Sequence, residues 1–270
     1  SKDVHSVVND MAAELKCSDF KPLSFELDFG KVSEIPPIRI GDGEESLELK
    51  GVVDRVDGWV HDDKLYLRVV DYKTGKKSFS LADVLYGMNL QMLLYLFALG
   101  KNGEKLYGKQ IVPAGVLYVP ARDVFVSANA DMSDDELALE RAKGIKRSGL
   151  LLDDPAVIAA MENGENPKYI PVKFKDGVFS GDALASAERL GVLSRHIDET
   201  LCEMAKQLKR GSIAADPFYR TQQENACLHC DYLAACRFKD GENGEKMRTI
   251  PKRLAATKVW SIIEGGEDNG

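Results

Sequence analysis

Two stretches rich in valine and aspartate decide the fold of this chain: Gly51-Val52-Val53-Asp54-Arg55-Val56-Asp57 and Val69-Val70-Asp71-Tyr72-Lys73. They belong to two longer runs, 47–60 and 65–72, that are rich in Val and Leu as strands are. A short polar turn, residues 61–64, joins the two runs. Strands connected by such a turn pair as an antiparallel hairpin. The sequence therefore predicts a β-hairpin here.

The register of this hairpin brings two carboxylates together. If the turn is centred between residues 62 and 63, paired residue numbers sum to 125, and Asp54 lies opposite Asp71 with Cβ atoms ~5 Å apart. Carboxylates this close repel each other unless a cation lies between them, and Mg²⁺ takes hard oxygen ligands at ~2.1 Å. Lys73 shares a strand face with Asp71, where its ammonium can orient a water or stabilise charge on a phosphate. Taken alone, Asp54 or Asp57 could equally be a solvated carboxylate at a strand end.

The flanking segments complete an α/β pattern. Residues 81–99 have a helical period and are apolar nearly all round, so one buried helix is expected, with Gln91 and Tyr95 on a shared face. A strand is expected at 111–119, with Pro113 placing its start near an edge. Further expected elements are an amphipathic helix at 3–16, an extended piece at 24–29 and a long helix at 182–210. We therefore predict an α/β fold with a central mixed sheet flanked by helices.

Length and composition limit the classes of protein. The 270 residues suit one large domain, or one with an appendage. The net charge of −7 argues weakly against a free-standing nucleic-acid binder, although a local basic lining can coexist with an acidic exterior. The longest apolar run, at 88–99, is too short to span a membrane. No signal peptide is recognisable, so we expect a cytoplasmic protein without membrane contact.

The organisation along the chain suggests a core and a tail. Residues 1–215 are expected to form the core, with an excursion from it at about 121–180, and residues 216–270 a cysteine-bearing tail. The chain opens without Met and directly in a helical pattern, so we expect a fragment of something longer.

A basic turn follows the second strand of the hairpin, at residues 74–78. It is not a nucleotide-binding loop, because Val70 stands where that motif needs a glycine, so ATP hydrolysis is not expected of this chain by itself. Lys73, Lys76 and Lys77 instead form a basic rim suited to a phosphodiester backbone. A solvated turn is an equally good interpretation of Lys76 and Lys77 alone.

The five cysteines are an odd number, which disfavours a disulfide framework in a cytoplasmic protein. Three of them have a spacing typical of metal ligands: Cys227, Cys230 and Cys236. A zinc site or an iron–sulfur cluster would need a fourth ligand. His229 lies between two of these cysteines and is expected to point away, while Cys202 is expected to pack in the long helix.

Together these residues resemble the RecB-like branch of the PD-(D/E)XK nucleases, and most closely the C-terminal nuclease domains of AddB-type subunits of helicase–nuclease complexes. The matching segments are 51–57, 70–75, 84–87, 90–95 and the cysteine tail with Ile213 and Pro217. The resemblance implies a restriction-endonuclease-like core.

The resemblance also implies roles for individual residues. Asp54, Asp71 and the backbone carbonyl of Tyr72 would hold Mg²⁺ (or Mn²⁺). Lys73 would be the catalytic lysine. Gln91 and Tyr95 would form the helix motif of the family.

For the tail, the resemblance implies that Cys227, Cys230 and Cys236 are three of the four ligands of a [4Fe–4S] cluster. The fourth cysteine, and a histidine near the metal, would lie upstream of Ser1. The implied function is that of a Mg²⁺-dependent DNA exonuclease acting with an AddA-type helicase/nuclease subunit, in a complex that processes double-strand breaks for recombinational repair. Two alternatives remain open: a catalytically silent DNA-binding scaffold of such a complex, and a zinc-binding interaction domain.

Overall fold

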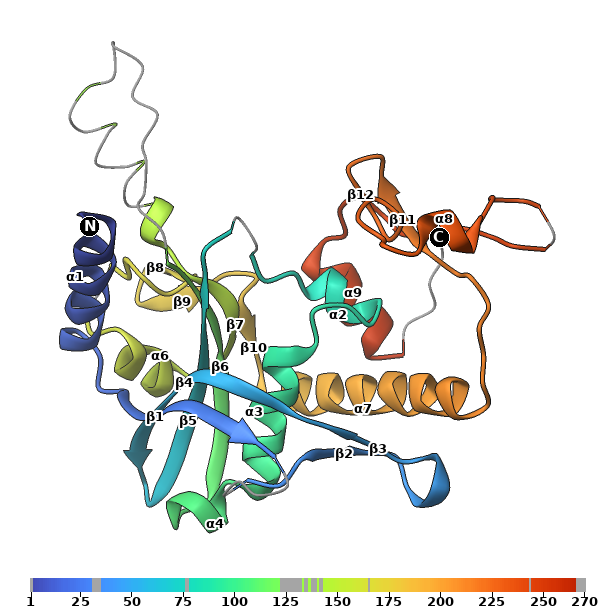
Figure 1. Ribbon diagram of the computed structural model, residues 1–270. Coiled ribbons are helices and arrows are strands. Elements are labelled where there is room, and N and C mark those ends of the chain that lie inside the picture. The colour runs from blue at the N-terminus through green and yellow to red at the C-terminus, as the bar shows by residue number, and fades with distance from the viewer. Residues whose placement is uncertain are drawn as a thin grey trace.

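A mixed sheet of six strands forms the centre of the molecule (Figure 1). The computed structural model describes residues 2–30, 35–75, 78–121, 133, 136, 140, 143–164, 166–242 and 244–265. The strand order is β1-β4-β5-β6-β7-β10, with β5–β6 and β7–β10 parallel and the other neighbours antiparallel. The strands are β1 (Lys21–Phe29), β4 (Gly51–His61), β5 (Lys64–Lys73), β6 (Ile111–Pro120), β7 (Ser148–Leu152) and β10 (Leu184–Ala185).

Helices lie on both sides of this sheet. In Figure 1, α1 and α6 lie to one side and α3 and α7 to the other. The helices are α1 (Lys2–Lys16), α2 (Leu81–Leu85), α3 (Gln91–Asn102), α4 (Glu104–Tyr107), α6 (Pro155–Met161), α7 (Ala187–Lys209), α8 (Leu233–Cys236) and α9 (Ala256–Ile263). Buried aliphatic side chains of β5, β6 and α3 form the middle of the core, among them Val69, Leu117 and Leu96. The predicted α/β class, with a mixed sheet flanked by helices, is confirmed.

Three small sheets lie outside the central one. Their strands are β2 (Ile38–Ile40) with β3 (Leu47–Leu49), β8 (Lys173–Lys175) with β9 (Val178–Ser180), and β12 (Glu224–Asn225), β11 (Phe218–Thr221) and β13 (Arg248–Thr249) in the tail. A short 3-10 turn, Gly43–Glu45, separates β2 from β3. None of the helices in the described ranges has both the length and the apolar character needed to cross a membrane.

The hairpin β4–β5 has the predicted register. Arg55 pairs with Val70 and His61 with Lys64, so paired numbers sum to 125. The two turn residues, Asp62 and Asp63, have φ of 47° and 60°. Positive φ at both central positions is the mark of a type I′ turn, whose twist matches that of the flanking strands. The turn therefore determines which residues face each other along the whole hairpin.

The predicted single helix over residues 81–99 is wrong, because the segment is broken into α2 and α3. Gly87 and Asn89 lie in the break with φ of 76° and 56°. Left-handed backbone cannot continue a right-handed helix, and Gly and Asn are the residues that adopt it most readily. The break starts a new helix at Gln91 and allows α3 to take its own direction across the sheet.

Two further predictions about the sheet are corrected. β6 lies between β5 and β7, so Pro113 is not near an edge. It is accommodated instead where the β5–β6 register shifts, a bulge that spares the strand a missing hydrogen bond. The expected excursion at 121–180 is also wrong from residue 148 onward, because the apolar residues of β7 join the sheet and Leu150 and Leu151 are buried. Most of residues 122–142 lie outside the described residues, and the boundary at 215 stays a prediction.

Candidate active site

Asp54 and Asp71 lie at one end of the sheet, where β4 begins and β5 ends. The ladder between the strands extends to the pair Arg55–Val70, and the same register carried one residue further places Asp54 opposite Asp71. Asp54 Oδ2 accepts a hydrogen bond of 2.9 Å from the backbone N–H of Tyr72. Both aspartates are half-buried. The hydrogen bond directs the Asp54 carboxylate toward β5, beside Asp71.

Lys73 contacts this acidic pair directly. Its Nζ lies 2.6 Å from Asp71 Oδ2 and 5.2 Å from the centre of the Tyr118 ring. Burial, reinforced by the charges of Asp71 and Asp83, raises the pKa of Tyr118 to about 12. The Tyr118 ring therefore stays neutral and presents its π face to the ammonium.

The donor set at this end of the sheet suits a hard divalent cation. Asp71 Oδ2 is buried and, within the described residues, accepts no hydrogen bond, so the ion pair with Lys73 is its sole charge partner there. No group of three or more His, Cys, Asp or Glu side chains in the described residues is arranged to hold a metal ion. A cation would therefore be held by two carboxylates, Asp54 and Asp71, with the backbone carbonyl of Tyr72 as a further oxygen.

Gln91 and Tyr95 form a hydrogen-bonded pair at the start of α3. Gln91 Nε2 donates to Tyr95 Oη over 3.0 Å, and the buried Tyr95 ring stacks on Phe29 with centroids 5.0 Å apart. Tyr95 Oη also lies against Gly51, the first residue of β4. Within the described residues, neither side chain hydrogen bonds to Asp54, Asp71 or Lys73. The pair is thus placed at the beginning of the strand that carries Asp54, without touching the acidic pair.

The substitution Gly51→Ala is expected to destabilise the protein and to displace this pair. A Cβ atom at position 51 would collide with Tyr95 Oη, so the ring must move. Forcing an atom into a packed site typically costs about 1–3 kcal/mol. The measurement is urea unfolding followed by circular dichroism. The matched control is Gly75→Ala, where a Cβ meets no atom within 4 Å. Equal stability of the two variants would contradict the prediction.

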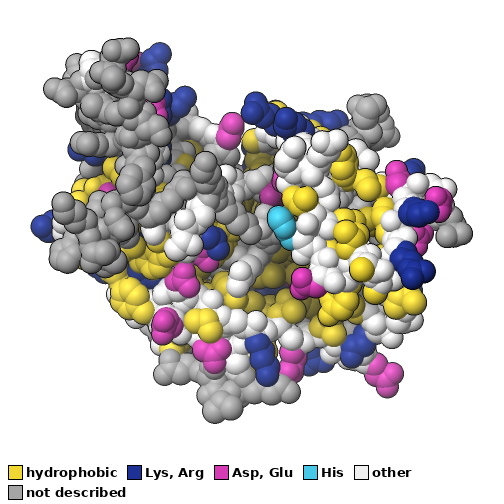
Figure 2. Space-filling view, turned by 45° about the horizontal axis from the view of Figure 1, so that its top comes forward, with side chains coloured by type: hydrophobic (Ala, Val, Ile, Leu, Met, Phe, Trp, Pro, Cys, Tyr) yellow, Lys and Arg dark blue, Asp and Glu magenta, His cyan; other side chains and the backbone are white. Residues whose placement is uncertain are grey.

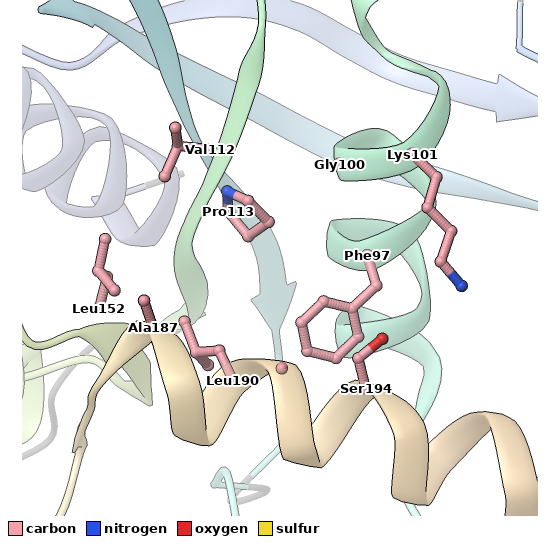
Figure 3. Close-up of a pocket in the computed structure, with 10 residues that line it drawn as sticks. Phe97, Gly100, Lys101, Val112, Pro113, Leu152, Ala187, Leu190 and Ser194 are labelled. Atoms are coloured by element: carbon pink, nitrogen blue, oxygen red, sulfur yellow. The ribbon is translucent and has the colours of Figure 1, made fainter.

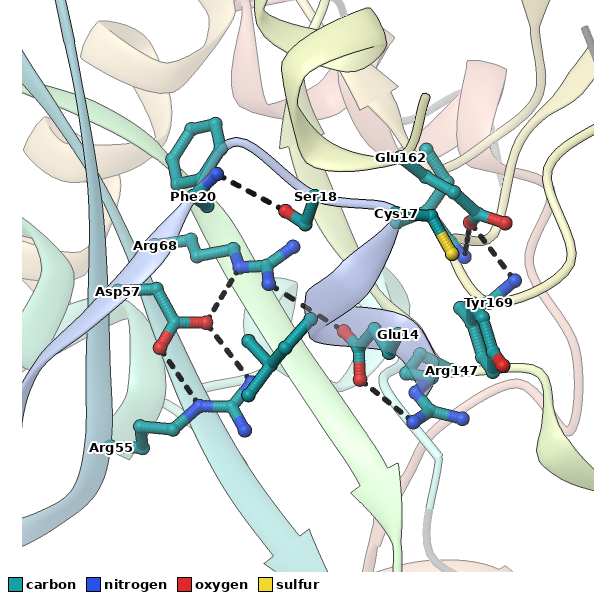
Figure 4. A network of polar contacts seen from close by, with 12 residues as sticks. Glu14, Cys17, Ser18, Phe20, Arg55, Asp57, Arg68, Arg147, Glu162 and Tyr169 are labelled. Atoms are coloured by element: carbon teal, nitrogen blue, oxygen red, sulfur yellow. Dashed lines mark hydrogen bonds and ion pairs between the residues drawn. The ribbon is translucent and has the colours of Figure 1, made fainter. Parts of the chain in front are cut away.

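A buried charge network lies beside the hairpin, and the sequence analysis missed it (Figure 4). Asp57 contacts Arg55 Nε at 2.8 Å and Arg68 Nε at 2.9 Å, with all three side chains at most 2% exposed. Arg68 Nη2 also lies 3.6 Å from Glu14 of α1. Glu14 in turn binds Arg147 Nη2 at 2.7 Å. Asp57 is therefore not a solvated carboxylate but the centre of this network.

The network ends at Tyr72. Arg55 Nη1 donates a hydrogen bond of 2.7 Å to the Tyr72 hydroxyl. Burial raises the pKa of Tyr72, so the hydroxyl stays protonated at neutral pH. Burial acts to lower the pKa of Arg55, but the charge of Asp57 outweighs it and the pKa is raised. A signal was present in the sequence, because Arg55 and Arg68 interrupt otherwise apolar strand segments.

The three cysteines lie on one short, exposed segment of the tail. Cys230 and Cys236 are exposed and Cys227 is half-buried, and all three are free thiols. The Cys230 N–H donates to the Cys227 carbonyl over 3.3 Å, which closes a turn between them. His229 inside this turn is exposed. As placed in the described residues, the thiols do not form a metal-ligand set.

The tail contacts the core beside the acidic pair. Arg220 of β11 pairs with Asp83 of α2 at 2.8 Å, and both side chains are largely buried. Asn89 Nδ2 donates to the same carboxylate over 2.6 Å. Helix α9 packs against α2 as well. Helix α2 thus connects the cysteine tail to the part of the core that holds Tyr118.

Charge is distributed unevenly over the surface. On the face shown in Figure 2, acidic and basic side chains are interspersed among apolar ones, and Lys and Arg side chains gather along its upper edge. The predicted basic rim at Lys76 and Lys77 lies outside the described residues. Of that rim, the structure describes Lys73.

An apolar cavity of about 290 Å³ lies between α3, β6 and α7 (Figure 3). It is lined mostly by apolar groups, among them Phe97, Val112, Pro113 and Leu190. Tyr118 and Gln91 lie at the opposite ends of β6 and α3 from these residues. The cavity is therefore separate from the candidate active site.

A mixed sheet whose neighbouring strands carry two aspartates and a lysine at one end is the arrangement that the sequence resemblance predicts. The sequence matches the PD-(D/E)XK nuclease superfamily over residues 2–237, and the chain belongs to this superfamily. The resemblance is thereby confirmed at the level of the family.

Curated relatives give a narrower similarity, to one kind of subunit of an ATP-dependent helicase/deoxyribonuclease. The chain is 34% identical over 261 residues to this protein from Clostridium kluyveri, an alignment that covers 94% of this chain and 22% of the relative. The protein of the same name from Listeria innocua is 32% identical over 269 residues, covering 97% and 23%. The chain therefore spans about a fifth of the length of the curated relatives it matches.

Proposed function

We propose that this chain is the nuclease domain of a helicase–nuclease complex, and that it hydrolyses DNA as a Mg²⁺-dependent exonuclease during the processing of double-strand breaks. The observation that carries the proposal is the close contact of Lys73 with Asp71, beside an Asp54 carboxylate held toward β5 by the Tyr72 N–H. A catalytically silent scaffold has no need to crowd two carboxylates and a lysine at a half-buried site, because burying charges costs free energy.

The proposed reaction assigns a task to each residue. A cation bound by Asp54, Asp71 and the Tyr72 carbonyl would acidify a water and polarise the phosphate. Lys73 places its ammonium where negative charge grows on the phosphate, and stabilises it there. Gln91 and Tyr95, at the start of α3, would position the DNA strand or steady the lysine.

The partners and the second cofactor follow from the relatives. We propose DNA as substrate and an AddA-type helicase/nuclease subunit as partner, because the similar proteins are named as subunits of an ATP-dependent helicase/deoxyribonuclease. We also propose that Cys227, Cys230 and Cys236 bind a [4Fe–4S] cluster in that complex, which their spacing supports. The hydrolysis described above does not involve the cluster.

Metal dependence tests the proposal. End-labelled single-stranded DNA is incubated with this chain in the presence of Mg²⁺ or of EDTA. We expect shortened products with Mg²⁺ and none with EDTA, since the phosphate has no other source of an activated water. Asp54→Asn, which keeps the shape of the side chain and removes its charge, is expected to be inactive with Mg²⁺.

The same assay is repeated with an AddA-type helicase subunit present. Cutting that persists in EDTA, or the absence of Mg²⁺-dependent cutting both alone and with the helicase subunit, would overturn the proposed nuclease function and favour the scaffold.

A further inference from the structure

We propose that Arg55 and Tyr72 are positioning residues for the metal-holding carboxylates, and that they connect the active site to the buried charge network on the other face of the sheet. This inference rests on the proposed function, because it assigns a task to residues around the same site.

Tyr72 belongs to both faces of the sheet. It lies between Asp71 and Lys73, and its backbone N–H holds Asp54 Oδ2 at 2.9 Å. Because side chains alternate along a strand, the Tyr72 side chain leaves on the face opposite to Asp71 and Lys73. Any shift of its backbone would therefore move the hydrogen bond that orients Asp54 and both neighbours in the sequence.

The Tyr72 side chain is held by Arg55. Arg55 Nη1 donates to the hydroxyl over 2.7 Å, and the guanidinium carbon lies 5.6 Å from the centre of the ring. Arg55 itself cannot turn away, because it is 1% exposed and binds Asp57 through Nε and Nη2 at 2.8 Å and 3.0 Å. Tyr72 is thus anchored to a buried and rigid group.

The anchor reaches as far as helix α1. Asp57 shares its carboxylate with Arg68, which contacts Glu14. Glu14 then binds Arg147. Buried ion pairs seldom add stability over apolar residues of similar volume, so stability alone is a poor reason for this arrangement. Fully paired buried networks do hold one unique geometry, and a metal site needs such a geometry.

The decisive variant is Tyr72→Phe, which removes one hydroxyl and keeps the ring. The whole chain, without DNA, is titrated with Mn²⁺ by isothermal titration calorimetry. Loss of a group that orients a metal ligand typically weakens metal binding by about 10–100-fold. We expect the Kd for Mn²⁺ to rise by about tenfold, the lower end of that range. The rate of DNA cleavage at saturating Mn²⁺ is expected to stay close to the wild-type rate.

The matched control is Tyr169→Phe. Tyr169 is also buried under an arginine, with Arg147 4.6 Å from its ring centre, but at the far end of the network. We expect its Kd for Mn²⁺ to equal that of the wild type. Arg55→Lys, which keeps the charge facing Asp57 and shortens the reach to Tyr72, is expected to behave like Tyr72→Phe. Urea unfolding of each variant records its stability.

Three results would overturn the inference. The first is a Kd of Tyr72→Phe equal to that of the wild type. The second is equal weakening by Tyr72→Phe and Tyr169→Phe, which would indicate a general loss of stability. The third is a wild-type chain that binds no Mn²⁺, and this result would also overturn the proposed metal site, which the first two leave intact.

Discussion

Lys73→Ala is expected to slow DNA hydrolysis by about 10²–10³-fold, the usual effect of removing one group that stabilises charge in a transition state. Lys73 is partly exposed at 26% and lies 2.6 Å from Asp71 Oδ2, so its ammonium sits beside the carboxylate that is proposed to hold the cation. Removing the ammonium leaves no positive side chain at that point on the strand. The measurement is the single-turnover rate of cleavage at saturating Mg²⁺.

Metal binding separates this effect from damage to the site. Lys73 neutralises Asp71, so its removal leaves the carboxylate free for a cation. The Kd for Mn²⁺ is therefore expected to stay the same or to fall, while the rate drops. The matched control is Lys101→Ala, because Lys101 forms a similar pair with Asp198 at 2.9 Å on the surface. Equal cleavage rates for the two variants would show that Lys73 takes no part in the reaction.

Local rules predicted the hairpin and, with it, the acidic pair. The position of the turn between Asp62 and Asp63 is enough to set the register of every pair along β4 and β5. The predicted face shared by Gln91 and Tyr95 is seen as a hydrogen bond between them. Both features depend on residues close in sequence, where turn geometry and helical periodicity determine who faces whom.

Features that depend on distant segments were not predictable in the same way. Glu14 and Arg147 are 133 residues apart and meet in the buried network. No periodicity in one sequence connects such residues, because the packing of α1 on the sheet brings them together. The break before Gln91 was missed for another reason: Gly87 and Asn89 are compatible with an apolar helical pattern until their backbone is seen to be left-handed. The same limit applies to Arg55 and Tyr72, whose contact crosses the hairpin diagonally.

The site therefore has one part that sequence pattern specifies and one that only the fold assembles. Asp54, Asp71 and Lys73 lie on paired strands and follow from their register. The groups behind them, from Arg55 to Arg147, come from three different segments of the chain. If the second part holds the first in place, changes in the network should be detected both in stability and at the metal site.

Asp57→Asn is expected to lower the free energy of unfolding by about 3–5 kcal/mol, the cost of removing one member of a buried ion pair. Asp57 is fully buried between Arg55 and Arg68, so the variant leaves two guanidinium groups facing each other without their shared carboxylate. The measurement is urea unfolding followed by circular dichroism. The matched control is Asp198→Asn, which breaks the exposed pair with Lys101. Exposed pairs contribute only about 0–1 kcal/mol. A loss for Asp57→Asn no larger than that of Asp198→Asn would mean that the two arginines find other partners, and that Asp57 is not what holds the network together.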